Sequence, residues 1–554
     1  MNVKPDCNRA DGARTSSTPG DVTRSARRWW ALVAIAASVL VVGLDLTVLN
    51  LALPSMAVSL HASTGDLQWI VDSYSLVLAA LILPAGLLGD RFGRKRVLVI
   101  ALVVFGAASL ACAYATSTGA LIAARAVLGI GAAAIFPLAL SVLPVLFEGA
   151  DRQRAVAAIG GASMLSFPIG PIVGGYLLDH FWWGSVFLIN VPVVVLALIA
   201  VVTLLPESRS AMRPRIDLVG MAVSSAGLVA LTYGFIKAGQ DGWSDGLAIG
   251  LLVAGVLALA VALPLVERLV TRRGGQPLAD LRLFKSSSFR SGTILATLIS
   301  FAMFGLFFAL PQYFQDVRGA DALGSGLRLL PLIGGMLIGM VGGTRLGTPL
   351  RSAGGGPATG PAVGPRALVT TGYLIMAAAM GLGALTGLSS STGYVLAWVA
   401  LAGLGLGLVM PTAMSVALSA LSAERSGAGS ALLTAMRQVG STVGVAVLGT
   451  VISTSYSSGV ATAASGLPSQ AAAAVRSSVG AGVGVATKLG SASLLDTVRT
   501  AFVHGMDIML WTCGGIAVGC AILALLVLGR RVAAGTVPNE TADAGGEASS
   551  LPVG

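Results

Sequence analysis

The sequence predicts an all-α integral membrane protein, and three observations carry this prediction. Hydrophobic residues make up 55% of the 554 residues, charged residues only 11%, and the mean hydropathy is +0.86. Apolar runs of about 20 residues, the length that crosses a bilayer as a helix, recur along the chain. The alternating pattern of membrane barrel strands is absent. Backbone groups in lipid must bond internally, so we expect the runs to be helices.

Residues 1–29 are predicted to form a disordered cytoplasmic tail. The first residues are polar and rich in Ser, Thr and Gly, a composition that disfavours a packed core. Arg24, Arg27 and Arg28 then precede an apolar run that starts near Trp30. This run is too long for the apolar region of a signal peptide, and no convincing cleavage site follows it. We therefore interpret it as the first membrane helix.

Fourteen segments are predicted to span the membrane. They are 30–53, 68–88, 97–115, 120–146, 155–178, 183–205, 216–238, 246–267, 291–314, 324–347, 367–387, 393–418, 428–453 and 502–529. Between them, 277–285 mixes apolar and charged residues as an amphipathic surface helix does. The Gly/Pro-rich stretch 352–365 is predicted to be a flexible loop.

The distribution of basic residues predicts that both termini are cytoplasmic and that the bilayer is the cell membrane. Alternate loops carry Arg91, Arg94, Lys95, Arg96, Arg152, Arg154, Arg209, Arg213, Arg215, Arg268, Arg272, Arg273, Arg282, Lys285, Arg290, Arg345, Arg351, Arg366 and Arg425. The loops 54–67, 116–119, 179–182 and 388–392 contain no Lys or Arg. We expect the latter to face outward, together with a long Ala/Ser/Gly-rich loop at 454–501.

This topology also explains the net charge of +11 without nucleic acid as a partner. The four cysteines show no metal-ligand spacing, and we expect no disulfide framework. No nucleophile–base or metal constellation stands out. We therefore predict no enzymatic activity, no metal and no cofactor.

Two charged residues inside predicted spans are the leading candidates for chemistry. Asp45 lies in the first span and Arg125 early in the fourth. A charge at mid-span costs about 2.5–3.5 kcal/mol on insertion scales, so such residues are functional candidates by default. At 1.5 Å per residue, both lie roughly 10 Å below the outer surface. This shared depth permits either a structural ion pair or a proton-exchanging site reached through a cavity.

Asn50, Asp72 and Tyr74 complete the candidate proton-coupling and cavity residues. Asn50 follows Asp45 in the first span, and the other two lie near the outer end of the second. Asp72 is either a functional acid or a group close enough to water to need no explanation.

The fifth span carries Gly170, Pro171, Gly174 and Gly175. Proline removes a backbone hydrogen bond and bends a helix, and small residues allow neighbouring helices to approach closely. The span therefore suits either a moving interface between helix bundles or tight packing alone.

These segments resemble the motifs of one family. The stretch Gly89–Arg96 resembles motif A of the major facilitator superfamily, and the Asp45 segment resembles the first-helix motif of its drug:proton antiporters. Further resemblances are Arg125 with Gly129, Gly131, Ala132 and Ala133 to motif B, Gly170–Gly175 to motif C, and also Phe187–Pro192 and Arg437–Ser441. The order and placement over about 30–530 are similar to the fourteen-span branch of these antiporters.

The resemblance implies a major facilitator fold of two six-helix bundles, 30–205 and 291–530, with two inserted helices and an amphipathic linker in 206–290 and a cytoplasmic tail at 531–554. It implies that the chain exports a lipophilic drug, antibiotic or secondary metabolite in exchange for protons, by alternating access and as a monomer in the lipid bilayer. Asp45 would exchange the proton, and Arg125 would oppose its uptake.

The resemblance also implies a conformational latch in the loop after the second span. Its residues are Gly89, Asp90, Arg91, Gly93, Arg94 and Lys95. Asp90 would face a helix N-terminus, and Arg94 would pair with Glu148 or Asp151. The alternative is that the basic residues only hold this loop in the cytoplasm.

The sequence departs from the family pattern at two positions and leaves several functions open. Leu128 stands where a Gln often precedes the motif B glycine, and Thr344 stands where a second-half motif A would have Asp. Central acids of cation-exporting relatives are missing from the later spans, so neutral, zwitterionic or anionic substrates stay open. A membrane sensor without transport, a channel and an importer of the same fold are the competing functions.

Overall fold

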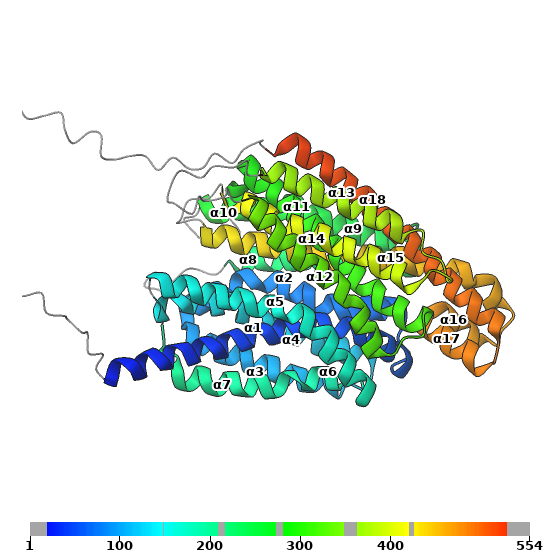
Figure 1. The fold of residues 1–554 in the computed structure, drawn as a ribbon, viewed down its shortest axis with the longest axis horizontal. Coiled ribbons are helices and arrows are strands. Elements are labelled where there is room, and N and C mark those ends of the chain that lie inside the picture. Colours follow the sequence, from blue (N-terminus) through cyan, green and yellow to red (C-terminus); the bar gives the residue numbers. More distant parts are fainter. Residues whose placement is uncertain are drawn as a thin grey trace, which may run out of the picture. The chain divides into compact units, whose positions relative to one another are not determined.

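The computed structural model describes residues 19–147, 149–208, 217–272, 281–347, 363–419 and 426–528. Within these ranges the regular structure is helical, and no strand occurs. The chain divides into two compact units, whose helices are labelled in Figure 1. The first unit comprises 1–278 and 319–327, and the second comprises 279–318 and 328–554.

The first unit contains the helices that carry the leading candidate residues. They are α1 (Pro19–Ser59), α2 (Thr64–Phe92), α3 (Arg94–Ala113), α4 (Thr118–Leu146), α5 (Gly149–His180), α6 (Ser185–Leu188), α7 (Asn190–Leu204), α8 (Leu218–Asp241), α9 (Gly246–Leu257), the π-helix η1 (Ala258–Ala262) and α10 (Leu263–Arg272). The inserted helix α8 packs against α2 in this unit, where the rings of Tyr233 and Trp69 lie 5.7 Å apart.

The second unit begins with a short 3₁₀ turn and continues as a bundle. Its elements are η2 (Leu281–Lys285), α11 (Ser287–Gln312), the π-helix η3 (Tyr313–Val317), α12 (Ala322–Gly347) from Arg328 onward, α13 (Pro365–Gly383), α14 (Thr392–Ser419), α15 (Ser426–Ser465), α16 (Ser469–Ser477), α17 (Val479–Lys488) and α18 (Ala492–Val527). The turn η2 is the described part of the predicted amphipathic segment, and most of the predicted loop 352–365 lies outside the described residues.

Helices of the structure overlap each of the fourteen predicted spans. Thirteen helices of the described residues are long and apolar enough to cross a membrane. The remaining predicted span is α2, a helix of 29 residues that carries Asp66, Asp72, Asp90 and Arg91. A capping box starts α2, because the Ser63 side chain accepts from the Asp66 N–H while Asp66 Oδ2 accepts from the Ser63 N–H at 2.9 Å.

Two regions predicted as a tail and a loop contain helices in the structure. Helix α1 begins at Pro19, so the predicted tail 1–29 overlaps its first turns. The predicted loop 454–501 is also mostly helical, because α15 continues to Ser465 and the helices α16 and α17 follow it at the end of α15 and α18 (Figure 1). Its alanines favour helix, and the Tyr456 hydroxyl donates to the carbonyl oxygens of Val475 and Ser478 at 2.7 and 3.1 Å.

Candidate functional site

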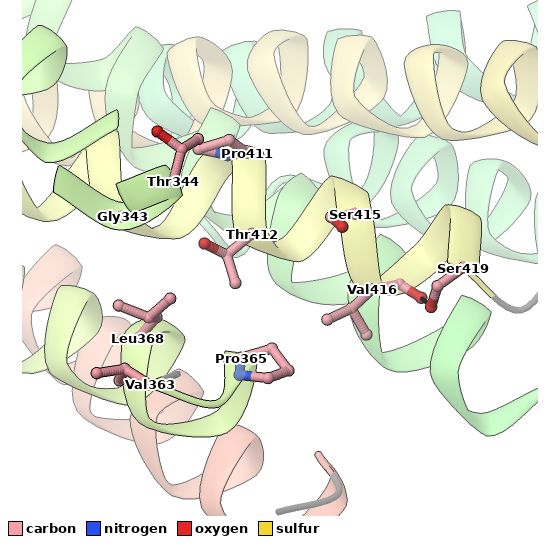
Figure 2. Close-up of a pocket in the computed structure, with 10 residues that line it drawn as sticks. All are labelled: Gly343, Thr344, Val363, Pro365, Leu368, Pro411, Thr412, Ser415, Val416 and Ser419. Carbon is pink, nitrogen blue, oxygen red and sulfur yellow. Dashed lines mark hydrogen bonds between the residues drawn. The ribbon is translucent and has the colours of Figure 1, made fainter. Parts of the chain in front are cut away.

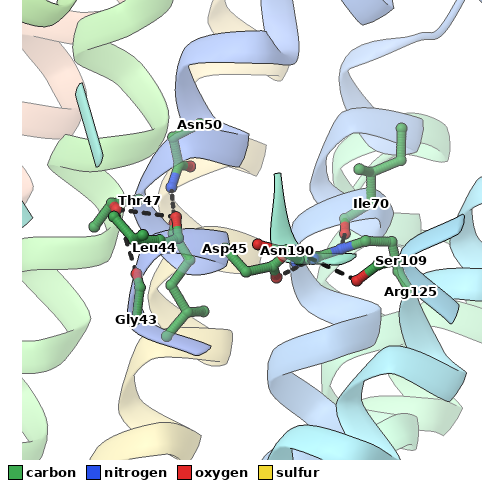
Figure 3. A network of polar contacts seen from close by, with 10 residues as sticks. Gly43, Leu44, Asp45, Thr47, Asn50, Ile70, Ser109, Arg125 and Asn190 are labelled. Atoms are coloured by element: carbon green, nitrogen blue, oxygen red, sulfur yellow. Dashed lines mark hydrogen bonds and ion pairs between the residues drawn. The ribbon is translucent and has the colours of Figure 1, made fainter. Parts of the chain in front are cut away.

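The first unit buries an ion pair between Asp45 on α1 and Arg125 on α4. Arg125 Nη1 lies 2.5 Å from Asp45 Oδ2, and the two side chains are 0% and 1% exposed. Figure 3 shows both groups inside a network of polar contacts. The shared depth predicted from the sequence therefore corresponds to direct pairing. A buried pair of this kind is costly to break, because removal of one partner leaves the other charge uncompensated.

Helix α2 supplies further contacts to the arginine. Arg125 Nε donates to the Ile70 carbonyl oxygen at 3.1 Å. The guanidinium lies 4.4 Å from the centre of the Tyr74 ring and 5.9 Å from that of Phe187, so both rings present their negative faces to the cation. Among the described residues Nη2 has no hydrogen-bond partner. The cation is thus held by a carboxylate, a carbonyl and two aromatic rings.

Asn190, the first residue of α7, holds the other carboxylate oxygen. Its Nδ2 donates to Asp45 Oδ1 at 3.3 Å and lies 3.4 Å from the Ser109 hydroxyl of α3 (Figure 3). Asn190 is fully buried. Neither Asn190 nor Ser109 was among the candidate site residues. The signal for Asn190 was present, since it is a lone amide in an otherwise apolar span.

The network joins five helices of the first unit at the Asp45 carboxyl. Arg125 and Asn190 each contact one oxygen of this carboxyl. Helices α1, α2, α3, α4 and α7 contribute to the network through Asp45, Ile70, Ser109, Arg125 and Asn190.

Of the other predicted cavity residues, Tyr74 contacts the network, whereas Asp72 and Asn50 do not. The Tyr74 ring contacts Arg125, while its hydroxyl has no partner among the described residues. Asp72 is 0% exposed and neither of its carboxyl oxygens has a partner among these residues, which excludes the water-exposed interpretation. Asn50 Nδ2 donates to the Leu46 carbonyl oxygen at 2.8 Å, within α1.

Helix α5 packs closely on the part of α1 that carries Asp45. Gly170, Pro171, Gly174 and Gly175 are all buried. A Cβ on Gly170 would meet Thr47 Oγ1 at 2.0 Å, and one on Gly174 would meet the Val48 side chain at 2.7 Å. The predicted small-residue contact is therefore present, and its partner is the helix of the ion pair.

The loop between α2 and α3 docks onto the last turn of α7 and the segment that follows it. Gly93 has φ +111°, a backbone conformation that favours glycine and permits the sharp turn. Arg94 N donates to the Ser208 carbonyl oxygen at 2.9 Å, and Lys95 Nζ donates to that of Val202 at 2.7 Å. Gly89 is buried and Arg91 is exposed.

The predicted acidic partners of this loop are only partly described. Glu148 and the side chain of Asp90 lie outside the described residues. Asp151, the other predicted partner of Arg94, forms ion pairs with Arg28 at 3.5 Å and Arg154 at 3.3 Å. The proposed role of Asp90 stays a prediction.

A separate cavity of about 350 Å³ lies in the second unit, between the end of α12, the start of α13 and α14 (Figure 2). Its polar lining consists of the hydroxyls of Thr344, Thr412, Ser415 and Ser419, and it contains none of the predicted site residues. Throughout the described ranges, no group of three His, Cys, Asp or Glu side chains is arranged to hold a metal ion.

Comparisons with known proteins identify the family. The model of the Major Facilitator Superfamily matches residues 35–445. The tetracenomycin C resistance and export protein of Streptomyces glaucescens is 34% identical over 520 residues, which is 92% of this chain and 93% of that protein. The multidrug efflux pump LfrA of Mycolicibacterium smegmatis is 33% identical over 522 residues, 94% of this chain and 98% of that protein.

A solved structure supports the same fold. A bacterial homologue of the human lysosomal transporter Spinster, in an inward-facing and unoccupied conformation, aligns with a TM-score of 0.65 at 17% identity and covers 94% of this chain and 100% of that one. At this identity the likeness concerns the fold alone.

Proposed function

This chain belongs to the Major Facilitator Superfamily, and we propose that it is a proton-coupled antiporter that exports a lipophilic drug, antibiotic or secondary metabolite from the cell. The buried pair of Asp45 and Arg125 is the observation that carries the proposal, because a charge pair inside the membrane is costly and marks ion pathways. The names of the two relatives, a resistance and export protein and an efflux pump, support export as the direction.

In the proposed cycle Asp45 takes up a proton from the outside and releases it to the cytoplasm. Uptake neutralises the carboxylate and frees Arg125, and the change accompanies outward release of the substrate by alternating access. Return of the proton to the cytoplasm restores the ion pair. An inside-negative potential of about 100 mV supplies roughly 2.3 kcal/mol for each net charge moved inward.

Asp72 is the second acid that we assign to proton or substrate binding. It is fully buried, and among the described residues both carboxyl oxygens lack a protein partner. A buried carboxyl without partners is costly unless it is neutral or meets a ligand. Its place on α2, two residues from Tyr74, puts it on the helix that also contacts Arg125.

We further propose that both termini and the α2–α3 loop lie in the cytoplasm and that the loop acts as a latch. The basic residues of this loop favour that side. Single cysteines replacing Arg96 and Ser389, both exposed, test the topology with a membrane-impermeant thiol reagent in whole cells. We expect Ser389→Cys to react and Arg96→Cys to react only after permeabilisation; the reverse pattern would invert the topology.

Transport by purified protein in proteoliposomes tests the antiport. A panel that includes tetracenomycin C, scored by accumulation in deletion and overexpressing cells, first selects the substrate. An imposed pH gradient should then drive uptake of the substrate into inside-out oriented vesicles. Asp45→Asn should lose gradient-driven transport by at least about 100-fold, because an amide cannot carry the proton, while substrate counterflow continues.

The matched control is Arg476→Gln, which removes a charge from an exposed position on α16. Its transport should equal that of the wild type. Full gradient-driven transport by Asp45→Asn would refute the assignment of Asp45. Substrate movement by the wild type that ignores the proton gradient would point to a channel, and absence of any transport would point to a sensor.

A further inference from the structure

A second arginine, Arg437 on α15, lies inside the second unit, and no acidic residue in the described part of that unit forms an ion pair with it. Its Nε lies 3.4 Å from the Ser300 hydroxyl of α11. Its Nη1 and Nη2 lie 3.5 and 3.8 Å from the sulfur atoms of Met414 and Met410 on α14. The guanidinium is therefore surrounded by three helices of the same unit and is met by one hydroxyl and two thioethers, which are weak acceptors.

The positive charge of Arg437 is not neutralised by the described part of the second unit. The acidic residues described there are Asp316, Asp496 and Asp507, and none forms an ion pair with it. Asp316 lies beyond the end of α11, more than about 20 Å along the helix from Ser300. A partly buried guanidinium that meets only one hydroxyl and two thioethers is costly unless an anion joins it.

Other polar groups beside Arg437 also lack partners. Thr297 Oγ1 on α11 and Gln438 Nε2 on α15 are buried without a hydrogen bond in the described ranges. The two helices touch at this level, because a Cβ on Gly440 would lie 2.4 Å from the Thr297 carbonyl oxygen. Thr297 and Gly440 lie one turn from Ser300 and Arg437 on these two helices, and Gln438 follows Arg437 directly in α15.

We infer that Arg437 is a substrate-binding residue and that the exported substrate is a planar aromatic molecule with a carboxylate or an acidic phenol. This inference rests on the proposed export function and specifies its substrate class. A guanidinium matches a carboxylate with two parallel hydrogen bonds. The thioethers of Met410 and Met414 suit an aromatic ring, and Thr297 and Gln438 offer hydrogen bonds to further oxygen atoms.

The chemistry of arginine separates this role from proton transfer. A guanidinium stays protonated in proteins, so Arg437 cannot carry the coupled proton. Its constant charge instead selects for an anion in every step of the cycle. The absence of central acids from the later spans, noted in the sequence, fits the same preference.

Equilibrium binding to the purified full-length chain in detergent micelles tests the inference. The two probes are anthracene-2-carboxylate and its uncharged carboxamide, which share one ring system and differ in charge. Empty micelles provide the correction for partitioning. We expect the wild type to bind the carboxylate at least about tenfold more tightly than the amide, a modest value for a charge-assisted pair.

Three variants and one control variant test whether this preference for the carboxylate depends on Arg437. Arg437→Met should weaken carboxylate binding by about 10- to 100-fold and change carboxamide binding by less than about twofold. Met414→Glu should have the same effect, because its carboxylate would occupy the guanidinium in place of the probe. Arg437→Lys should retain part of the preference, and the exposed Arg476→Gln should retain all of it.

The outcomes separate this inference from the export proposal. If Arg437→Met lost affinity for both probes equally, the residue would have a structural role and the inference would be overturned. An unchanged preference of this variant for the carboxylate would also overturn it. Proton-driven export of a neutral or cationic substrate by a wild-type protein that binds the two probes equally would also overturn it, while leaving the export function in place. Carboxylate binding that depends on Arg437 in a protein without gradient-driven transport would refute only the antiport.

Discussion

Each unit contains an arginine inside its helices, Arg125 fully buried and Arg437 partly buried, and the surroundings of the two are opposite in character. Arg125 in the first unit has a carboxylate at 2.5 Å, a backbone carbonyl and two aromatic faces. Arg437 in the second unit has a hydroxyl and two thioethers, and within the described part of that unit no acid. The protein itself neutralises the charge of Arg125, whereas we propose that the bound substrate neutralises the charge of Arg437.

This difference assigns different roles to the two units of the chain. A neutralised pair responds to a proton, because protonation of the acid breaks it. An uncompensated cation does not respond to protons but attracts an anion. In our proposal, the first unit supplies the proton coupling and the second unit supplies the selectivity for substrate charge.

The largest expected effect is a difference in stability between matched substitutions of the two arginines. Arg125→Met leaves the buried Asp45 carboxylate without a counter-charge and should lower the free energy of unfolding by about 3–5 kcal/mol. Arg437→Met removes a charge that has no acidic partner in the described part of its unit, and should change the free energy of unfolding by less than about 1 kcal/mol. Equilibrium unfolding in mixed micelles measures both, and equal losses would refute the contrast between the two sites.

A compensating substitution sharpens the same comparison. Asp45→Leu combined with Arg125→Met removes both charges and should recover at least about 2 kcal/mol of the loss seen in Arg125→Met alone. Asn190 would then lack its acceptor, so recovery should be incomplete. A double variant no more stable than Arg125→Met would mean that the pair does not determine the stability of this region.

A smaller effect is expected where α5 holds α1 beside the ion pair. Gly170→Ala places a methyl group 2.0 Å from Thr47 Oγ1 and should destabilise the protein by about 1–3 kcal/mol. Gly160→Ala on the same helix meets nothing within 4 Å and should be neutral or stabilise by up to about 1 kcal/mol. The same unfolding measurement applies, and equal effects of the two substitutions would contradict the close contact between α1 and α5.

The smallest effect concerns the aromatic face above Arg125. Tyr74→Leu removes a ring 4.4 Å from the guanidinium and should lower the free energy of unfolding by about 1–2 kcal/mol. Tyr74→Phe keeps the ring and removes a hydroxyl without a described partner, so its change should stay within about 0.5 kcal/mol. A larger effect of Tyr74→Phe would show that the hydroxyl, rather than the ring, stabilises the arginine.

The sequence alone determined the fold class and identified the two charged residues of the first site. Long apolar runs can satisfy their backbone in lipid only as helices, so their number and position could be read directly. Asp45 and Arg125 stood out because charges in apolar spans are rare and costly. Boundaries in polar, Ala-rich stretches such as 454–501 were not predictable, because their helices depend on contacts such as that between Tyr456 and Val475.

Only the tertiary structure decided which polar groups meet. Depth along a helix can be counted, but the face that a side chain presents to a particular neighbour depends on how the helices pack. For this reason the sequence did not predict that Asn190 and Ser109 bond to the Asp45 network. It also did not predict that Asp72 and Asn50 make no bond to it. The contrast between Arg125 and Arg437 has the same origin, since both are arginines in helices and only their packed neighbours distinguish them.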